Sequence, residues 1–385
     1  MRVALFTETF LPRVDGITNT LCHVLPRLAE RNVETLLFAP AGAPPSFAAT
    51  PIVSLSGLPL PQYPEFKVIP PWAPFGKALR AFNPDLVHVL NPVTLGAGAL
   101  FWAKRAGVPV VASYHTDVPG FMRRWGHHTA ARLMQRYMRW LHNHADLNLA
   151  PSRFTLTALA REGYRHLALW GRGVDTTRFN PQRRSHAWRL RLSAGHPEQT
   201  LLLFVGRLSH EKRVEWVRAA LDAVPGVRFA VVGDGPARAQ LERTFAHTPT
   251  VFVGALRGDD LAAAYASADL FVFPSPNETL GNVVLEAMAS GLPVIAPASG
   301  GLLDHVRDGV NALLFPPEDR AAFVACIQRA VRGTALRAQL GAAALQHARQ
   351  CTWEHSVEAL ISAYRSVLQV NAKGVLPHPA PQWRT

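Results

Sequence analysis

Residues 270–296, LFVFPSPNETLGNVVLEAMASGLPVIA, hold a strand, a helix and a second strand in close succession. The apolar runs Leu270–Pro274 and Pro293–Ala296 predict buried strands, and the residues after Gly281 predict the helix that joins them. Continuous apolar strands separated by helices are typical of a parallel sheet that is covered on both faces. This stretch therefore predicts an α/β fold.

The same alternation of apolar runs and helix-length segments continues along the whole chain. Predicted helices include Asn19–Arg31, Leu95–Ala106 and Trp353–Val370. The predicted strands form two series, Val3–Phe6, Thr35–Ala39, Asp85–Leu90, Val108–Tyr114 and Leu147–Ala150, then Leu201–Gly206, Val227–Gly233, Val251–Gly254, Leu270–Pro274 and Pro293–Ala296. Two such series predict two doubly wound domains, joined near residues 171–200, where Arg, Gly and Pro are frequent.

Length and composition agree with a two-domain globular protein. The 385 residues exceed what one compact core usually holds, and a 48% hydrophobic content excludes a disordered chain. No apolar run is long enough to span a bilayer or to form a signal peptide, so we expect a cytoplasmic protein. Cys22, Cys326 and Cys351 lie far apart without a CxxC spacing, which argues against a disulfide framework or a zinc site.

The net charge of +13 predicts an anionic partner. Most of the excess lies in residues 1–180, which carry +9 of it. Nucleic acid is one candidate, but the sequence has no helix-turn-helix, zinc-finger or RNP-like pattern. We therefore expect a phosphorylated metabolite or an anionic lipid surface, and no nucleic acid.

Ligands of open parallel sheets bind beyond the carboxyl ends of the strands, so the loops that follow each strand matter most. Arg207 and Lys212 follow the strand Leu201–Val205, and two cations there suit a diphosphate, although ordinary surface cations would look the same. Gly16 ends the loop after the first strand, with Thr18 or Asn19 as the cap of the next helix. Gly16 either forms an ordinary turn or lets the backbone N–H groups approach an anion closely.

The loop and helix after Leu270–Pro274 carry two carboxylates, Glu278 and Glu286, eight residues apart. Glu278, in the loop, suits the hydroxyls of a sugar. Glu286, in the helix, suits the vicinal hydroxyls of a ribose. Thr279, Gly281 and Asn282 place small residues and free N–H groups at the helix start, which favours an anion. No Asp-x-Asp occurs anywhere in the sequence, so we expect fixed cations and this helix start, not a metal ion, to stabilise a leaving diphosphate.

These motifs resemble the retaining glycosyltransferases of family 4, which have the GT-B fold. The resemblance covers nearly the whole chain, in FTETFLPRVDGITNTL, PDLVHV, SYHTDVPGF, GRGVDTTRF, FVGRLSHEK, VVGDGP, VFVGAL and PNETLGNVVLEAMASGLPVIA. The opening, the SYHTD segment and the WGRGVD seam are most similar to a subgroup of GDP-mannose-dependent α-mannosyltransferases and sulfoquinovosyl-diacylglycerol synthases.

The resemblance implies two Rossmann-like domains that face each other across a cleft. Residues 1–175 would bind the acceptor, residues 176–353 would bind the nucleotide sugar, and a C-terminal helix of about 354–385 would pack back on the first domain. It also implies roles for individual residues: Gly16 near the diphosphate or the acceptor, His115 on the transferred sugar, Arg207 and Lys212 on the diphosphate, Glu278 on the hexose, Thr279, Leu280, Gly281 and Asn282 as backbone contacts, Glu286 on the ribose, and Val253, Gly254 and Leu256 beside the base.

The implied reaction moves a hexose, with mannose favoured, from GDP-mannose or a UDP-hexose to a lipid or lipid-linked acceptor, without a cofactor. Two other functions stay open. One is a transferase that uses UDP-glucose, UDP-sulfoquinovose or a soluble acceptor, and the other is a nucleotide- or nucleic-acid-binding regulator without catalysis.

The segment Phe121–His144, FMRRWGHHTAARLMQRYMRWLHNH, predicts a basic amphipathic helix from Thr129. Leu133, Met134, Tyr137 and Leu141 share one face of it. Such a helix either packs on the first domain or lies on an anionic bilayer, and the second alternative predicts a peripheral enzyme on the inner face of the plasma membrane.

Overall fold

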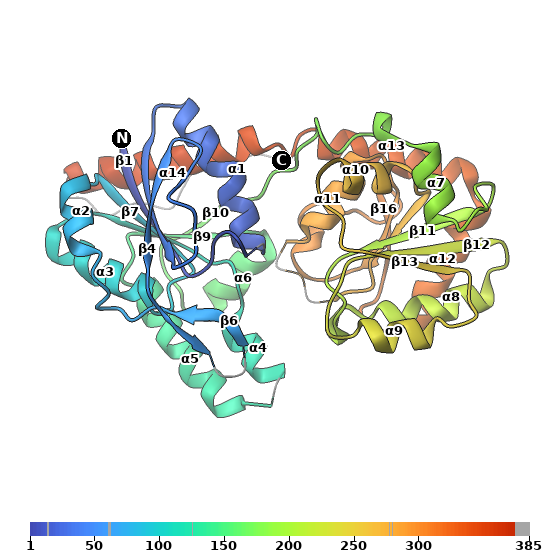
Figure 1. Cartoon of the computed structure of the whole chain (residues 1–385), viewed down its shortest axis with the longest axis horizontal. Helices are drawn as coiled ribbons and strands as arrows, with labels where there is room; N and C mark the ends of the chain where they lie inside the picture. The colour runs from blue at the N-terminus through green and yellow to red at the C-terminus, as the bar shows by residue number, and fades with distance from the viewer. Residues whose placement is uncertain (14, 61–62, 125, 277, 279, 374–385) are drawn as a thin grey trace. The chain divides into compact units, whose positions relative to one another are not determined.

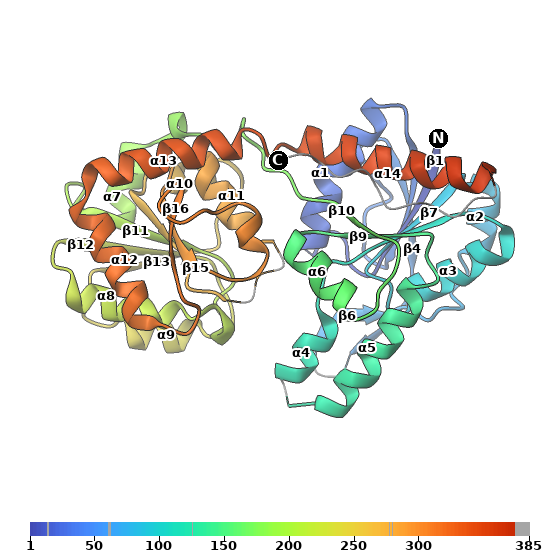
Figure 2. The ribbon, with the colours of Figure 1, turned by 180° about the vertical axis from the view of Figure 1, so that it is seen from behind.

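The computed structural model describes residues 1–373 except residues 14, 61–62, 125, 277 and 279. Contacts divide the chain into two units. The first unit comprises Met1–Gly171 together with the segment from Trp353 onward, and the second comprises Arg172–Thr352. Each unit contains one main sheet with helices on both of its faces (Figure 1 and Figure 2).

The first unit is built on an eight-stranded sheet with the strand order β10-β9-β8-β7-β1-β2-β4-β3, in which only β3 runs antiparallel to its neighbour. β5 and β6 form a separate antiparallel hairpin. The strands are β1 (Arg2–Thr7), β2 (Glu34–Pro40), β3 (Ser46–Phe47), β4 (Thr50–Leu55), β5 (Leu58–Leu60), β6 (Tyr63–Val68), β7 (Leu86–Leu90), β8 (Val110–Ser113), β9 (Leu147–Ala150) and β10 (Leu167–Leu169). The helices are α1 (Gly16–Glu30), α2 (Gly76–Phe82), α3 (Leu95–Ala106), α4 (Val118–Arg124), α5 (His128–His142), α6 (Arg153–Arg161) and α14 (Trp353–Lys373).

The central strand β1 shows why this sheet is covered on both faces. Its side chains alternate between two hydrophobic clusters, with Val3 and Leu5 in one and Ala4 and Phe6 in the other. The first cluster includes α1 and α14, and the second includes α2 and α3. The C-terminal helix α14 thus belongs to the core of the first unit, where Tyr364 is completely buried.

The second unit is built on a fully parallel six-stranded sheet with the order β13-β12-β11-β14-β15-β16. α7, α10, α11 and α13 lie on one side of the sheet, and α8, α9 and α12 lie on the other (Figure 1). The strands are β11 (Thr200–Val205), β12 (Val227–Val232), β13 (Thr250–Gly254), β14 (Leu270–Val272), β15 (Val294–Pro297) and β16 (Ala312–Phe315). The helices are η1 (Pro181–Arg183), α7 (His186–Leu192), η2 (His210–Lys212), η3 (Val214–Trp216), α8 (Val217–Ala223), α9 (Arg238–Thr244), α10 (Gly258–Ala266), α11 (Asn282–Ala289), η4 (Gly300–Asp304), α12 (Arg320–Arg332) and α13 (Thr334–Ala348).

All ten predicted strands are present, and the structure adds the edge strands β3, β10 and β16, the strand β4 between β2 and β3, and the β5–β6 hairpin. The predicted cap of the first helix is wrong. Asp15, not Thr18 or Asn19, caps α1, because its Oδ1 accepts hydrogen bonds from the N–H groups of Ile17 and Thr18 at 3.0 Å.

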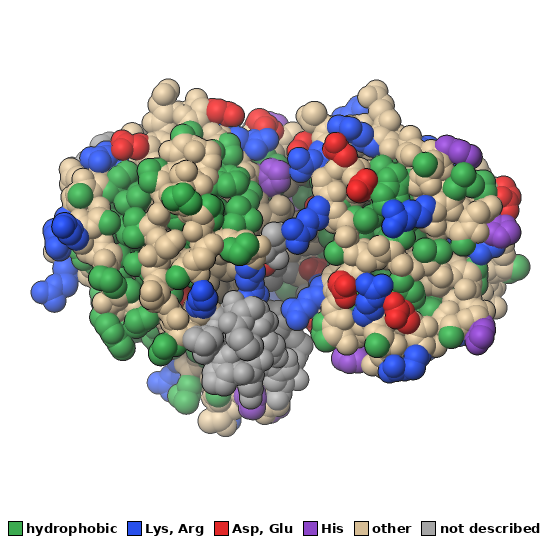
Figure 3. Space-filling view, viewed as in Figure 1, with side chains coloured by type: hydrophobic (Ala, Val, Ile, Leu, Met, Phe, Trp, Pro, Cys, Tyr) green, Lys and Arg blue, Asp and Glu red, His purple; other side chains and the backbone are tan. Residues whose placement is uncertain are grey.

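The basic helix α5 leaves large apolar side chains in contact with solvent. It buries Met138 and Leu141, while Leu133, Tyr137 and Trp140 are 63%, 36% and 47% exposed. Of the predicted apolar face, Leu141 therefore packs inward while Leu133 and Tyr137 do not. Hydrophobic side chains cover much of the visible face of this unit, on the left of Figure 3, and Lys and Arg side chains lie on both units. Among the described residues, no helix is both long and apolar enough to cross a bilayer.

Candidate active site

The adjacency of two strands in the second sheet brings distant loops together. β11 and β14 are direct neighbours, with Leu202 opposite Leu270, although β12 and β13 lie between them in the sequence. Because both strands run in the same direction, the loops that follow them leave the same edge of the sheet. Lys212 comes from the loop after β11, and Glu278 comes from the loop after β14.

Lys212 and Glu278 form an ion pair at this edge. The Lys212 ammonium donates a hydrogen bond to Oε1 of Glu278, and the Ser275 hydroxyl donates a second one at 3.0 Å. The two charged side chains are only 20% and 16% exposed. The Lys212 ammonium also lies 5.9 Å from the ring centroid of Phe273. One oxygen of Glu278 is thus engaged by protein donors, which fixes the orientation of the carboxylate.

The backbone of Glu278 is held by the loop after β15. The N–H of Gly301 donates to the carbonyl oxygen of Glu278 at 2.8 Å. Gly300 has a φ of +69°, and a Cβ atom at this position would lie 2.7 Å from that same carbonyl oxygen. Only glycine fits here without displacing the backbone of Glu278.

The helix α11 begins beside this loop. Its N-cap Gly281 has a φ of +81°, and an added Cβ would collide with Cδ2 of Leu302. Asn282 opens the helix, and its buried Oδ1 has no hydrogen-bond partner among the described residues. Leu280 is buried, while Thr279 lies outside the described residues. At the start of α11 the backbone of Gly281 thus packs closely against Leu302, and Oδ1 of Asn282 can accept a further hydrogen bond.

Glu286 lies on α11, and its carboxylate accepts a hydrogen bond from the Tyr265 hydroxyl at 3.0 Å. Burial raises the pKa of Glu286 to about 7, against the opposing effects of this hydrogen bond and of the Arg178 charge. Tyr265 is held in turn by a perpendicular ring contact with Phe179 at 5.7 Å. The carboxylate therefore keeps its proton to a higher pH than an exposed glutamate does.

The remaining predicted residues of the second unit lie at neighbouring strand ends. Arg207 follows β11, and its exposed side chain has no hydrogen bond or ion pair within the part of the chain that the structure describes. Val253, Gly254 and Leu256 lie at the end of β13, which is two strands away from β11. Gly233 after β12 donates its N–H to the carbonyl oxygen of Gly254 at 2.9 Å, which joins these two loops.

Gly16 and His115 are the predicted residues of the first unit. Gly16 lies at the end of the loop that follows β1, and His115 lies just after β8. Gly16 is the exposed first residue of α1, and a Cβ atom there would meet nothing within 4 Å. Asp15 beside it also accepts a hydrogen bond from the Thr9 hydroxyl at 2.6 Å.

His115 belongs to a buried chain of hydrogen bonds. Its Nε2 contacts the Ser113 hydroxyl at 2.7 Å, the same hydroxyl contacts Nε2 of His88 at 2.9 Å, and Nδ1 of His88 contacts the Tyr364 hydroxyl at 2.6 Å. Trp170 packs edge-on against both imidazole rings. Burial lowers the pKa of His88 to about 3, so His88 is neutral and can orient Ser113 and, through it, His115.

Sequence reasoning missed several residues that position the predicted ones, among them Ser275, Tyr265 and His88. Ser275 lies three residues before Glu278, which was a usable signal. Tyr265 and His88 sit within apolar stretches and carry no local signal, because their partners lie 21 and 276 residues away.

Two family models match the chain, Glycosyltransferase Family 4 over residues 14–178 and Glycosyl transferases group 1 over residues 199–332. The chain belongs to glycosyltransferase family 4. It is 40% identical to a GDP-mannose-dependent alpha-mannosyltransferase of Mycolicibacterium smegmatis over 96% of this chain and 98% of that relative. It is 37% identical to the sulfoquinovosyl transferase SQD2 of Arabidopsis thaliana over 91% of this chain and 71% of that relative.

The family 4 glycosyltransferase also resembles solved structures along nearly its whole length. The sucrose-phosphate synthase of Thermosynechococcus elongatus superposes with a TM-score of 0.79 at 22% identity, covering 96% of this chain and 99% of that one. The fold is therefore GT-B, as predicted. The protein is a hexosyltransferase enzyme, and the alternative of a regulator without catalysis is not supported.

Proposed function

We propose that this glycosyltransferase moves mannose from GDP-mannose to a lipid or lipid-linked acceptor at a membrane surface, with retention of the anomeric configuration and without a metal ion. The observation that carries the proposal is the Lys212–Glu278 pair beside the start of α11. It combines a cation for a diphosphate with a carboxylate for sugar hydroxyls. The name of the Mycolicibacterium smegmatis relative supports mannose as the first candidate for the transferred sugar.

Glu278 suits the hexose because one of its oxygens is already engaged. Lys212 and Ser275 both donate to Oε1, which leaves Oε2 to accept hydrogen bonds from sugar hydroxyls. Glu286 suits the ribose in the same way, since the Tyr265 hydroxyl donates to its Oε2. Both carboxylates are thus oriented before the donor binds, which lowers the entropy cost of binding.

Arg207, Lys212 and the start of α11 suit the leaving diphosphate. In the step that we propose, the bond from the anomeric carbon to the diphosphate oxygen breaks, and the acceptor oxygen bonds to that carbon on the same face. The acceptor proton passes to the departing phosphate oxygen. Negative charge grows on the diphosphate, and the Arg207 and Lys212 cations stabilise it. His115 would assist from the first unit by contacting the transferred sugar.

A second donor, UDP-sulfoquinovose, is favoured by one observation, the 37% identity to SQD2. The contacts around Glu278 do not distinguish the two sugars. Val253, Gly254 and Leu256, which we place beside the base, would determine whether guanosine or uridine binds.

The membrane part of the proposal rests on α5. Leu133 and Trp140 are exposed on this helix, together with Arg132 and Arg136, and Phe101 of α3 packs against Trp140 at 5.6 Å. Apolar side chains flanked by arginines suit an anionic bilayer surface. We expect reversible, salt-sensitive binding on this side of the first unit.

The test is donor turnover in EDTA. Purified protein is incubated with UDP- and GDP-sugars, with and without a lipid extract, while nucleotide release is followed and the anomeric configuration of the product is determined. We expect release from GDP-mannose that lipid stimulates, a retained configuration, and loss of turnover in Glu278→Gln. Glu358→Gln is the matched control, because this exposed carboxylate lies on α14 and pairs with Arg31, in neither of the loops that carry Lys212 and Glu278. Turnover that needs added divalent metal, or an unaffected Glu278→Gln variant, would refute the proposed mechanism.

A further inference from the structure

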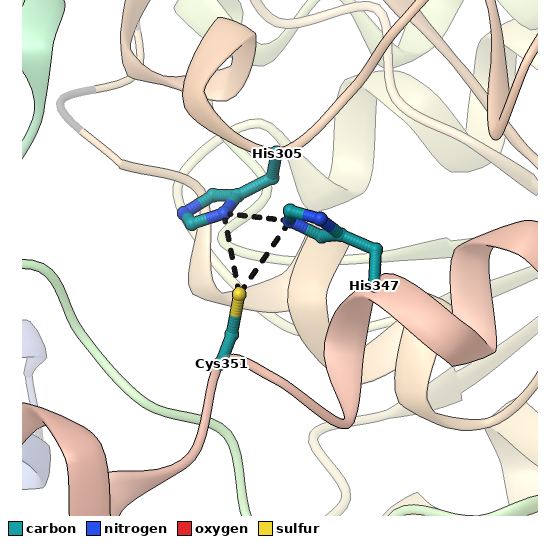
Figure 4. A group of neighbouring side chains, drawn as sticks. All are labelled: His305, His347 and Cys351. Carbon is teal, nitrogen blue, oxygen red and sulfur yellow. Dashed lines mark hydrogen bonds between the residues drawn. The ribbon is translucent and has the colours of Figure 1, made fainter. Parts of the chain in front are cut away.

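Three potential metal ligands converge in the second unit, away from Lys212 and Glu278 in the sequence. They are His305, just after η4, His347 in the last turn of α13, and Cys351, just beyond that helix (Figure 4). His305 is buried, and the other two are partly buried. The ring nitrogens of both histidines and the sulfur point toward one another in Figure 4.

The distances among the three ligand atoms are those of a metal site. His305 Nδ1 lies 3.3 Å from His347 Nε2, and Cys351 Sγ lies 3.5 Å from His347 Nε2 and 3.9 Å from His305 Nδ1. Zinc binds histidine nitrogen at about 2.0–2.1 Å and cysteine sulfur at about 2.3 Å in a tetrahedral arrangement. That geometry requires separations of about 3.3 Å between two nitrogens and about 3.6 Å between nitrogen and sulfur. The three atoms therefore need only small shifts to hold one ion.

The backbone around each ligand is fixed, so the arrangement does not depend on a loose loop. The N–H of His305 donates to Leu302 at 2.8 Å, and the side chain of Asn311 donates to the carbonyl oxygen of His305 at 2.9 Å. The N–H of Cys351 donates to Ala348 at 3.0 Å. Ligands that are held in place before binding lose little entropy when an ion arrives.

We propose that His305, His347 and Cys351 form a site for a thiophilic divalent metal ion, with zinc as the ion that the ligand set and spacing fit best. Two imidazoles and one thiolate leave a fourth position for water or another ligand. In the spacing His347-x3-Cys351, His347 lies in the last turn of α13 and Cys351 lies three residues beyond the end of that helix. The absence of CxxC had argued against zinc, but this site needs only one cysteine.

The site has a cost and a structural consequence. Burial raises the pKa of Cys351 to about 11, so an ion must displace the thiol proton at neutral pH. An ion here would tie the end of α13 to the segment that follows Gly300 and Gly301. Since those glycines contact the backbone of Glu278, metal binding would brace the loop of the candidate active site. The proposal does not depend on the proposed donor or acceptor.

The test uses full-length protein without a histidine tag, first stripped of metal with a chelator. Zinc is titrated by calorimetry and cobalt by absorption. We expect one equivalent of each to bind, and bound cobalt to show a thiolate charge-transfer band. Cys351→Ser and His347→Ala should each raise the dissociation constant at least about a hundredfold, because even loss of outer-shell partners costs 10–100-fold.

Cys326→Ser is the matched control, since Cys326 is also a partly buried cysteine of the second unit but lies outside the cluster. Circular dichroism of the metal-free variants tests that they fold. No stoichiometric binding, a missing charge-transfer band, or equal affinity in the folded Cys351→Ser variant would overturn the proposal.

Discussion

Replacing Gly300 by alanine tests whether the backbone of the β15 loop positions Glu278. The added Cβ would lie 2.7 Å from the carbonyl oxygen of Glu278, which is about 0.7 Å shorter than an ordinary contact of 3.4 Å. The loop must therefore move, and it also loses a left-handed residue that only glycine adopts cheaply, at φ +69°. That conformation costs an ordinary residue about 1–2 kcal/mol.

Gly309 provides an unusually close control. It has the same φ of +69°, but a Cβ atom there would meet nothing within 4 Å. Gly309→Ala therefore places an alanine in the same left-handed conformation, but its Cβ does not collide with a neighbouring atom. We expect both variants to lose stability, by about 2–4 °C in Tm for each kcal/mol.

Activity should separate the two variants. A misplacement of 1 Å at a reacting centre can cost about a hundredfold in rate, so a shift of about 0.7 Å should lower kcat/KM roughly twenty-five-fold in Gly300→Ala. Gly309→Ala should keep the wild-type kcat/KM once folding is complete. The assay is initial-rate nucleotide release at saturating acceptor, alongside thermal unfolding. Equal kcat/KM in the two variants would refute the idea that this contact positions Glu278.

Three further predictions concern other parts of the molecule. Because burial raises the pKa of Glu286 to about 7, the wild type should lose stability relative to Glu286→Gln as the pH rises from about 4.5 to 7, as measured by denaturant unfolding. Over the same range kcat/KM for the donor should rise, since the ionised carboxylate accepts the ribose hydroxyls. Ser113→Ala removes the link between His88 and His115 and should cost about 1–3 kcal/mol of stability and lower kcat without changing the donor KM. Leu133→Ser should weaken binding to anionic vesicles roughly tenfold in co-sedimentation, because a buried leucine contributes about 1.5–3 kcal/mol.

Each of these has a contrary outcome. A pH-independent difference between wild type and Glu286→Gln would mean that the carboxylate does not titrate in this range. Thr35→Val removes a buried hydroxyl that bonds to Thr50 at 2.6 Å, so an equal loss of kcat there would make the Ser113 effect a general one. Phe154→Ser removes a side chain that is 52% exposed on α6, and equal loss of vesicle binding there would exclude a specific role for α5.

The sequence allowed the parallel sheets to be predicted because their strands are continuous apolar runs. Leu201–Val205 and Leu270–Val272 are almost completely buried, and burial on both faces leaves no polar residue to obscure the pattern. Apart from β4, which has six residues and lies between β2 and β3, the missed strands are short or lie at sheet edges. Ala312–Phe315 has only four residues, and the β5–β6 hairpin lies in a proline-rich segment whose pattern does not resemble a strand.

The individual residues of the candidate active site were easier to predict than their contacts. Glu278 and Lys212 each stand out because charged residues follow an apolar strand. Their ion pair joins positions 66 apart, and it exists only because β14 adds to the sheet beside β11 and not beside β13. Nothing local in the sequence determines that order. The same reasoning explains why His305 was not grouped with His347 and Cys351, since 42 and 46 residues and the whole of α12 separate it from them. Local pattern thus identifies which residues are chemically capable, whereas strand order determines which of them act together.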